Sequence, residues 1–373
     1  MTENTSVNRV LIHQMGSLGD TIVALPCYHL IARAFPNSQR MLLTNTPHLQ
    51  KAPSADAILG NSGLIHGYIQ YDPAKRAALW RKAREIRRFK PDVVVYIMWI
   101  YRPEAQLRRD VRFFRLVSGV RRFIGVPHSI EPRLERMDQS GLYEPESHRL
   151  ARMIEVLGDA APDDLANWDL HLTKKENARG LEALGAFANK PLIACGPGTK
   201  MQAKDWGQDN WQTLMKRLSP EFPGYSLVMV GAKEDHSASE HVAKGWQGDT
   251  LNLCGVLTPR ETAAALSKAE LFLGPDSGPM HLAALNGVPC AIPFAARDYP
   301  GVWYPVGNIH RVIYHAVDCR HCRLATCVEQ KKKCLTSISV DEMFKATLEA
   351  WRNGNNRAHP SMASATSVTE LES

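Results

Sequence analysis

The chain has 373 residues, of which 44% are hydrophobic and 22% charged, values that exclude a disordered or fibrous protein. Its length favours two domains over one small module. The first residues lack the basic and apolar pattern of a signal peptide, and the longest apolar run, 93–101, is too short to cross a bilayer. We therefore expect a cytoplasmic protein whose eight cysteines are reduced or bind metal.

The formal net charge of +7 is concentrated in one region. Between Lys75 and Arg122 there are fifteen Lys or Arg residues and four acidic ones, whereas the rest of the chain is slightly acidic. Such a region attracts phosphates, whether on nucleic acid, on lipid headgroups or on a phosphorylated glycolipid. Solvated helix faces are the alternative explanation.

The first half of the chain alternates predicted strands and helices. Short apolar runs predict buried strands, and apolar residues at helical spacing predict helices. In chain order, we expect a strand at 10–12, a helix at 21–35, a strand at 40–43, a basic helix at 76–88 and a strand at 93–100.

The same alternation resumes after a polar segment at 173–190. The expected elements are strands at 192–194, 226–230, 271–273 and 289–294, and helices at 211–218, 260–268, 278–286 and 340–351. The tail from residue 353 is rich in Ser, Thr, Ala and Asn and is predicted to be disordered.

This order predicts an α/β protein with two Rossmann-like, doubly wound domains that face each other across a cleft. We place the first domain at 1–172, an interdomain linker at 173–190, the second domain at 191–352 and a tail at 353–373. In such sheets, ligands bind beyond the carboxyl ends of the strands. The glycine-containing turns fall at these ends.

The first such turn runs from Gly16 to Asp20, after the strand at 10–12. It lacks the full G-x-G-x-x-G spacing of a dinucleotide site. Asp20 opens the following helix, so a helix cap is its local interpretation. A general base that takes a proton from an attacking hydroxyl is the functional one.

A second turn, Asp276-Ser277-Gly278-Pro279, lies between the strand at 271–273 and a helix. The amides near Ser277 and Gly278 are expected to be unpaired at the positive end of the helix dipole, an arrangement typical of diphosphate binding. A helix start capped by Asp276 or Ser277 is the alternative. His281, in the first helical turn, is either a packed polar residue or a hydrogen-bond donor to phosphate.

Two further turns carry polar side chains suited to a nucleotide. The turn at 196–206 contains Thr199, Lys200 and Lys204, and lysine binds phosphate as a flexible point charge. The turn at 231–235 contains Glu234, whose carboxylate could accept hydrogen bonds from ribose hydroxyls. Each lysine taken alone is better explained as a solvated surface group.

Together these motifs resemble the heptosyltransferase family of bacterial lipopolysaccharide synthesis, glycosyltransferase family 9, from Val10 to about Trp351. The matching segments are V-L-I-H-Q-M-G-S-L-G-D-T-I-V-A-L-P, P-G-T-K-M-Q-A-K-D-W, G-A-K-E-D and D-S-G-P-M-H-L-A-A-L-N-G-V-P. The resemblance implies a GT-B fold, in which the first domain binds the acceptor and the second binds a nucleotide sugar. The nucleotide sugar that the resemblance favours is ADP-heptose. Gln14, Lys200 and Ala295 depart from the family pattern and leave the sugar and acceptor open.

The resemblance also implies roles for individual residues. Asp20 is the expected catalytic base. The expected donor-binding residues are Thr199, Lys200, Lys204, Glu234, Asp276, Ser277, Gly278, Pro279 and His281. For the acceptor, we expect contacts from Ser17 and Gly19 beside Asp20 and from the basic Arg108, Arg109 and Arg112.

The implied reaction is a single inverting displacement. Asp20 would deprotonate an acceptor hydroxyl, and the amides, the helix dipole and Lys204 would stabilise the charge on the leaving diphosphate. We therefore expect no metal cofactor in catalysis. The expected acceptor is an anionic glycolipid of the lipopolysaccharide core, which the protein would meet by peripheral contact with the inner face of the inner membrane.

Four cysteines lie within sixteen residues, with the spacing C-x2-C-x4-C-x6-C: Cys319, Cys322, Cys327 and Cys334. Four thiolates can hold structural zinc or iron, with His321 as a spare ligand. Reduced or redox-active thiols are the alternative. The other four, Cys27, Cys195, Cys254 and Cys290, lie in apolar contexts and are expected in the core.

Other functions remain open from the sequence. A non-catalytic nucleotide-sugar-binding module and a transferase with another nucleotide sugar or a protein acceptor share the same motifs. A nicotinamide oxidoreductase is disfavoured by the missing third glycine and the missing ribose acid. A nucleic-acid-binding protein is disfavoured because the basic region has no recognised binding motif, so we expect no nucleic-acid partner.

Overall fold

The computed structural model describes residues 7–46, 53–75, 77–98, 104–126 and 136–358. Two sheets form the frame of the molecule, and each recorded strand pair is parallel. The first sheet has the order β3-β2-β1-β4-β5 and contains β1 (Arg9–His13), β2 (Gln39–Asn45), β3 (Gly67–Tyr71), β4 (Val93–Tyr96) and β5 (Arg122–Ile124). The second has the order β11-β10-β9-β6-β7-β8 and contains β6 (Leu192–Cys195), β7 (Ser226–Met229), β8 (Thr250–Asn252), β9 (Ala269–Leu273), β10 (Cys290–Phe294) and β11 (Arg311–Tyr314).

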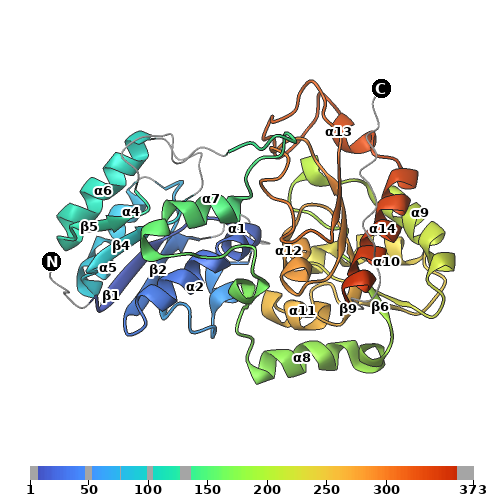
Figure 1. The fold of residues 1–373 in the computed structure, drawn as a ribbon, viewed down its shortest axis with the longest axis horizontal. Helices are drawn as coiled ribbons and strands as arrows, with labels where there is room; N and C mark the ends of the chain where they lie inside the picture. The colour runs from blue at the N-terminus through green and yellow to red at the C-terminus, as the bar shows by residue number, and fades with distance from the viewer. Residues whose placement is uncertain (1–6, 47–52, 76, 99–103, 127–135, 359–373) are drawn as a thin grey trace.

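Helices flank both sheets, as parallel strands require (Figure 1). In the first half these are α1 (Leu18–Val23), α2 (Leu25–Ala34), α3 (Ala55–Leu59), α4 (Ala78–Arg81), α5 (Ala83–Phe89), α6 (Glu104–Ser118) and α7 (Glu146–Met153). In the second half they are α8 (Lys174–Leu184), α9 (Gln208–Leu218), α10 (His236–Ala243), α11 (Pro259–Leu266), α12 (Gly278–Leu285), α13 (Lys333–Thr336) and α14 (Val340–Ala358). No helix in the described ranges is long and apolar enough to span a bilayer.

Both sheets reverse their strand order at one place, and this reversal fixes where ligands can bind. In the first sheet, the chain proceeds outward from β1 through β3 and then returns to place β4 on the other side of β1. In the second, β6 and β9 are the neighbours at the reversal. The loops after these central strands diverge to opposite faces of the sheet and leave room for a ligand. Three of the turns singled out from the sequence lie in these loops, after β1, β6 and β9, and the fourth, at 231–235, follows β7.

Several predicted elements have different limits in the structure. The helix predicted at 21–35 starts earlier, at Leu18, and is divided into two helices. The break is at Ala24, two residues before Pro26. The basic helix predicted at 76–88 is likewise divided into α4 and α5, and residue 76 lies outside the described residues. The strand predicted at 93–100 ends at Tyr96, and its last two predicted residues are not described.

The two ends of the second half also differ from expectation. The polar segment 173–190 contains α8, which packs along α11 (Figure 1). The predicted disorder from residue 353 is wrong for its first residues, since α14 continues to Ala358. Residues 359–373 of the predicted tail lie outside the described residues.

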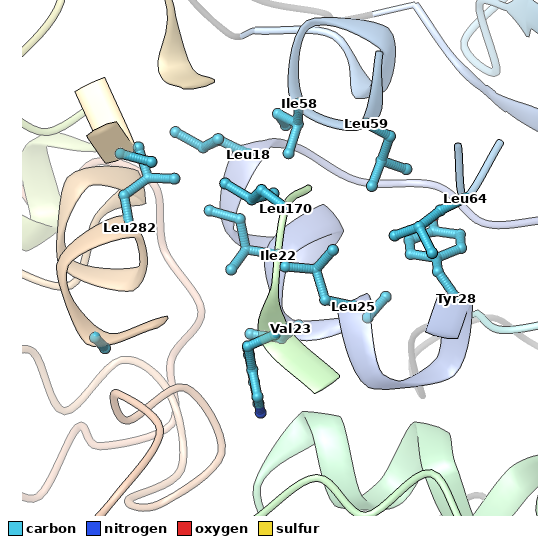
Figure 2. Close-up of a cluster of buried hydrophobic side chains, with 14 of the residues drawn as sticks. Leu18, Ile22, Val23, Leu25, Tyr28, Ile58, Leu59, Leu64, Leu170 and Leu282 are labelled. Carbon is cyan, nitrogen blue, oxygen red and sulfur yellow. The ribbon is translucent and has the colours of Figure 1, made fainter. Parts of the chain in front are cut away.

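One hydrophobic cluster connects the two halves of the molecule. It includes Leu18 and Ile22 of α1 together with Leu282 of α12, and Figure 2 shows these side chains on the two neighbouring helices. Leu170, on the segment that joins the halves, belongs to the same cluster. Two further clusters form the remaining cores of each sheet. Apolar packing therefore fixes α1 against α12, and with them the turns that precede both helices.

Candidate functional site

The turn before α1 is organised by the Asp20 carboxylate. Ser17 is the N-cap residue and Asp20 is the third residue of the helix, so the expectation that Asp20 itself caps the helix is wrong in position. Asp20 Oδ2 instead accepts hydrogen bonds from the Ser17 backbone N–H at 2.7 Å and from Ser17 Oγ at 2.9 Å. Both of these hydrogen bonds use the same carboxylate oxygen.

The protonation of Asp20 is shifted by its surroundings. Burial raises the pKa of Asp20 above its ordinary value of 3.8 because it disfavours the charged form. The hydrogen bonds from Ser17 and the positive charge of Lys204 oppose this rise. A carboxylate with a raised pKa is a better proton acceptor.

The turn before α12 presents an unpaired hydroxyl at the start of a helix. Ser277 is the N-cap residue of α12, but its side chain makes no capping hydrogen bond. Its Oγ is buried and has no hydrogen-bond partner among the described residues. A buried hydroxyl without a partner is costly unless a ligand completes it. Since the first amides of a helix also lack partners within the helix, the turn is suited to an anion.

The two turns meet each other at the centre of the molecule. A Cβ atom on Gly278 would lie 2.0 Å from Leu18 Cδ2, and a Cβ on Gly19 would lie 3.3 Å from His281 Cδ2. Only a residue without a side chain permits so close an approach at Gly278. The structure thus brings Asp20, Gly19 and His281, which come from opposite halves of the chain, to one place.

His281 is buried at this junction. Burial lowers the pKa of His281 to about 4, against the opposing charge of Asp276. The ring is therefore neutral at neutral pH, with one nitrogen as a hydrogen-bond donor and the other as an acceptor. His281 lies in the first turn of α12, and its contact with a ligand stays a prediction.

A lysine between two buried carboxylates lies beside the α12 turn. Lys204 Nζ is 2.5 Å from Asp276 Oδ2 and 3.9 Å from Asp298 Oδ2. The side chain of Lys204 is 14% exposed, and those of Asp276 and Asp298 are 6% and 9% exposed. Burial raises the pKa of Asp298, although Lys204 and Arg297 oppose the rise.

Asp298 and Arg297 were not among the residues predicted from the sequence. They follow β10, and loops after parallel strands are where ligands bind, so their position was the available signal. Nothing in the local sequence indicated that Asp298 would lie beside Lys204. The pair lies ninety-four positions apart in the chain, and only the fold brings it together.

Lys200 and Asp235 are two further charged residues from the second half of the chain. Burial lowers the pKa of Lys200, while the charges of Asp20 and Asp235 oppose the change, so this lysine is close enough to both carboxylates to interact with them. A Cβ on Gly198 would lie 2.4 Å from Asp235 Cγ. Asp235, at the end of the turn at 231–235, therefore lies against the turn at 196–206. The sequence analysis had singled out its neighbour, Glu234.

The remaining donor-side residues are less enclosed. Glu234 is exposed on a short 3-10 helix, Lys233–Asp235. Thr199 is half-buried, and its hydroxyl accepts a hydrogen bond from the Met201 backbone N–H at 3.3 Å. Pro279 is the second residue of α12, where its missing N–H costs no helical hydrogen bond. The roles of these residues stay predictions.

The three arginines expected at the acceptor lie on α6, on the outer flank of the first half (Figure 1). All three are exposed. Arg108 pairs with Glu104 at 2.5 Å and Arg109 with Asp110 at 3.1 Å. Their contact with an acceptor stays a prediction.

The cysteines divide into two groups, as the sequence suggested. Cys27, Cys195, Cys254 and Cys290 are buried, which confirms their expected place in the core. Cys319, Cys327 and Cys334 are half-buried and Cys322 is exposed. Among the residues that the structure describes, no three His, Cys, Asp or Glu side chains are gathered as metal ligands. The pKa of Cys334 is raised by burial and further by the other three thiols of its segment.

Comparison with families and curated proteins relates the whole arrangement to known enzymes. A family model described as glycosyltransferase family 9 (heptosyltransferase) matches residues 138–333, more than half of the chain. Two Escherichia coli proteins named lipopolysaccharide heptosyltransferase 3 are 29% and 26% identical over 36% and 46% of this chain. The matched segments span 39% and 49% of those relatives. Lipooligosaccharide heptosyltransferase 2 of Campylobacter jejuni is 18% identical over 93% of this chain and 99% of its own length.

Solved structures agree in fold over nearly the whole chain. A family 9 glycosyl transferase from Veillonella parvula has a TM-score of 0.68 at 17% identity and covers 94% of this chain and 99% of its own. The ADP-heptose lipopolysaccharide heptosyltransferase II of E. coli has a TM-score of 0.63 at 16% identity, with 93% and 99% coverage. These similarities confirm the predicted α/β class and the GT-B arrangement of two Rossmann-like halves.

Proposed function

Because the chain belongs to glycosyltransferase family 9, we propose that it is an inverting glycosyltransferase that moves a heptose from ADP-heptose onto a lipopolysaccharide-core or related glycan acceptor. The observation that carries the proposal is the junction of α1 and α12. There, a carboxylate with a raised pKa and an anion-binding helix start come from opposite halves of the chain. One half then supplies a base and the other a place for a leaving diphosphate.

The reaction follows from the chemistry of these groups. The Asp20 carboxylate takes the proton of an acceptor hydroxyl while its oxygen attacks the anomeric carbon of the donor. The bond between that carbon and the diphosphate oxygen breaks, and the nucleoside diphosphate leaves from the opposite face, which inverts the configuration. The Ser277 hydroxyl, the Ser277 and Gly278 amides and the Lys204 ammonium stabilise the negative charge on the diphosphate. The other proposed donor contacts are Thr199, Lys200, Glu234, Asp276, Pro279 and His281.

ADP is the proposed nucleotide. Two solved relatives support it: an E. coli heptosyltransferase with ADP, and the same enzyme with an ADP-linked fluorinated heptose. In this proposal, residues 1–172 form the acceptor domain, residues 173–190 form the linker and residues 191–352 form the donor domain.

The acceptor is proposed to be an anionic glycolipid. Arg108, Arg109 and Arg112 are exposed on one helix, within a region of strong positive charge. Such a surface attracts phosphorylated sugars and anionic headgroups. Ser17 and Gly19 would contact the acceptor beside Asp20, and the protein would work by peripheral contact with the inner face of the inner membrane.

A structural metal at the cysteine-rich segment 319–334 is also a proposal. One solved neighbour, TibC from enterotoxigenic E. coli, is described as an iron-containing glycosyltransferase, with a TM-score of 0.51. Four thiolates suit zinc or iron, although the described side chains are not gathered as ligands. No step of the reaction is assigned to a metal. Metal analysis of anaerobically purified protein is expected to find about one ion per chain, and a content near zero removes the proposal.

The proposed function is tested by transfer from ADP-heptose to a series of truncated lipopolysaccharide cores, with ADP release and the glycan product both measured. We expect the wild type to form product and Asp20→Asn to lose transfer by about 10³-fold or more while it still binds ADP. Asp209→Asn, at an exposed carboxylate of α9, is the control and should behave as wild type. ADP binding without transfer by the wild type to any acceptor would favour a non-catalytic binding module.

A further inference from the structure

The cysteine-rich segment 319–334 packs directly against the donor side of the site. His321 N donates to the Ala296 carbonyl at 2.6 Å, and Arg323 N donates to the Arg297 carbonyl at 3.0 Å. The loop after β10, which carries Asp298, is therefore bonded by its backbone to this segment. The proposed mechanism gives the segment no task, although it contacts residues next to Lys204.

The same segment also contacts the loop that carries Lys204. Ala203 N donates to the Ala325 carbonyl at 3.1 Å, and Cys327 N donates to Gln202 Oε1 at 2.8 Å. Gln202, Ala203 and Lys204 form one short 3-10 helix. Residues 321–327 thus join the loop after β6 to the loop after β10, and Lys204 and Asp298 lie on these two loops.

Arg297 is the side chain at the centre of this junction. Its Nε donates to the Leu324 carbonyl at 2.8 Å, one terminal nitrogen donates to the Arg323 carbonyl at 2.9 Å, and the other donates to Asp298 Oδ2. The side chain is 11% exposed. A planar guanidinium can meet two carbonyls and a carboxylate at once, which an ammonium cannot do with the same geometry.

The charges explain why Arg297 matters for a diphosphate. Asp298 is 9% exposed and has two cations near it, Arg297 in direct contact and Lys204 at 3.9 Å. A buried carboxylate that loses one cation pairs more closely with the other. Without Arg297, Lys204, which already contacts Asp276 at 2.5 Å, would be drawn closer to Asp298, and its ammonium would be less available to phosphate oxygens.

We propose that Arg297 is a positioning residue that neutralises Asp298, keeps Lys204 available to the leaving diphosphate and connects the 321–327 segment to the donor site. The consequence for ligand binding rests on the proposed function, whereas the mechanical connection between the segments does not. The two parts are therefore measured separately.

The first measurement is ADP affinity by calorimetry. Arg297→Ala is expected to weaken ADP binding about tenfold, and Arg297→Lys should lie between it and the wild type because a lysine retains the charge. The decisive variant is Arg297→Ala with Asp298→Asn, which removes the competing carboxylate and should recover most of the lost affinity. Arg311→Ala, which breaks an exposed pair with Glu349, is the control and should bind ADP as wild type does.

A general loss of structure at Arg297 would not be repaired by Asp298→Asn, so this rescue separates positioning from folding. If the double variant binds ADP no better than Arg297→Ala, or if Arg297→Ala binds as Arg311→Ala does, the proposal is overturned. If Arg297→Ala does not fold, the comparison is made between Arg297→Lys with and without Asp298→Asn, with the same criterion.

The second measurement is hydrogen exchange of the unliganded protein, which does not depend on the nucleotide. Arg297→Ala is expected to increase exchange in peptides over 200–206 as well as over 321–327, relative to Arg311→Ala. Unchanged exchange at 200–206 contradicts the connection. If the wild type itself fails to bind ADP, the proposed function is wrong, and hydrogen exchange alone decides the proposal about Arg297.

Discussion

The Asp20 carboxylate has a structural role in the turn before α1, and we propose a chemical role for the same side chain. One oxygen holds the turn before α1 through Ser17, and the helix start therefore fixes the position of the other oxygen. Burial raises the pKa of Asp20, so the carboxylate accepts a proton more readily. The same shift means that it becomes neutral at a higher pH than an ordinary aspartate does. If Asp20 is the base, as we propose, an amide at this position should abolish catalysis.

The raised pKa of Asp20 predicts the pH dependence of transfer. A base acts only when it is deprotonated, so kcat/KM should fall as the pH is lowered through a midpoint above the ordinary 3.8 of an aspartate. The measurement is kcat/KM, from initial rates of ADP release at subsaturating substrate, from about pH 4 to pH 8. A rate that stays constant down to pH 4 would show that Asp20 is not the group whose proton uptake limits transfer.

At the scale of elements, the site depends on how closely α1 and α12 approach. Their contact is fixed by Gly278, whose missing side chain leaves room for Leu18, and by the apolar cluster that Figure 2 shows around Leu18 and Leu282. Small changes here should move Asp20 relative to the turn before α12, which we propose binds the diphosphate.

Gly278→Ala tests this packing. The added methyl group would collide with Leu18, and overpacking of this kind costs about 1–3 kcal/mol of stability. We expect a lower midpoint of urea unfolding and a lower kcat. Gly19→Ala is the matched comparison, because its methyl group meets His281 at a distance of 3.3 Å and should destabilise less. Equal stability of Gly278→Ala and wild type would contradict the tight contact.

The arginines of α6 make a separate prediction at this scale. Reversing the charge of Arg108, Arg109 and Arg112 together should raise the KM for the glycolipid acceptor about tenfold and leave the KM for the donor unchanged, because long-range attraction acts on the anionic acceptor. The control reverses Lys174, Lys175 and Arg179 of α8. If the acceptor KM does not change, or changes as much in the control variant, the basic face of α6 is explained as a solvated surface.

The elements also show how far the sequence predicted this molecule. Strands that are buried on both faces, such as β1, β4, β6 and β10, were recognised because each is a continuous apolar run. The edge strands β3, β5, β8 and β11 were missed because their residues are partly exposed and their patterns are mixed. The turns that carry Asp20, Ser277 and Lys204 were found, since glycine and polar residues at strand ends are a local signal. Asp298 and Arg297 were not predicted, because they contact residues that are distant in the sequence, and no local pattern shows such contacts.

At the scale of the whole molecule, a buried arginine joins the two halves. Arg260 of α11 donates to the Ile58 carbonyl of α3 at 2.9 Å and to the Leu170 carbonyl at 2.9 Å. Its Nε and one terminal nitrogen also bond the Glu176 carboxylate of α8 at 2.7 and 2.9 Å. One guanidinium therefore links the first half, the connecting segment and the second half.

This link predicts a pH-dependent stability. The Arg260 side chain lowers the pKa of Glu176 to about 2, below its ordinary 4.5. Because the folded-state pKa is depressed, the contribution is complete above pH 4.5 and is lost as the pH falls toward 2. Glu176→Gln should therefore destabilise the protein by about 2 kcal/mol at neutral pH and by progressively less as the pH falls below 4.5.

Urea unfolding of wild type and Glu176→Gln at several pH values measures this difference. Glu182→Gln, at an exposed carboxylate on the same helix, is the control and should have little effect at any pH. A stability difference that stays constant as the pH is lowered would contradict the assigned pairing of Glu176 with Arg260.

The selectivity among nucleotides is the first test of whether the protein is an ADP-sugar transferase. The shift of the thermal unfolding midpoint would be measured with ADP, UDP, GDP and NAD at equal concentrations, since a ligand that binds the folded state raises the midpoint according to its affinity. For an ADP-sugar transferase we expect a clear shift with ADP that is much larger than with the other three, and the loss of this shift in Lys204→Ala. A preference for UDP or GDP, or no shift with any of the four, would contradict an ADP-sugar transferase.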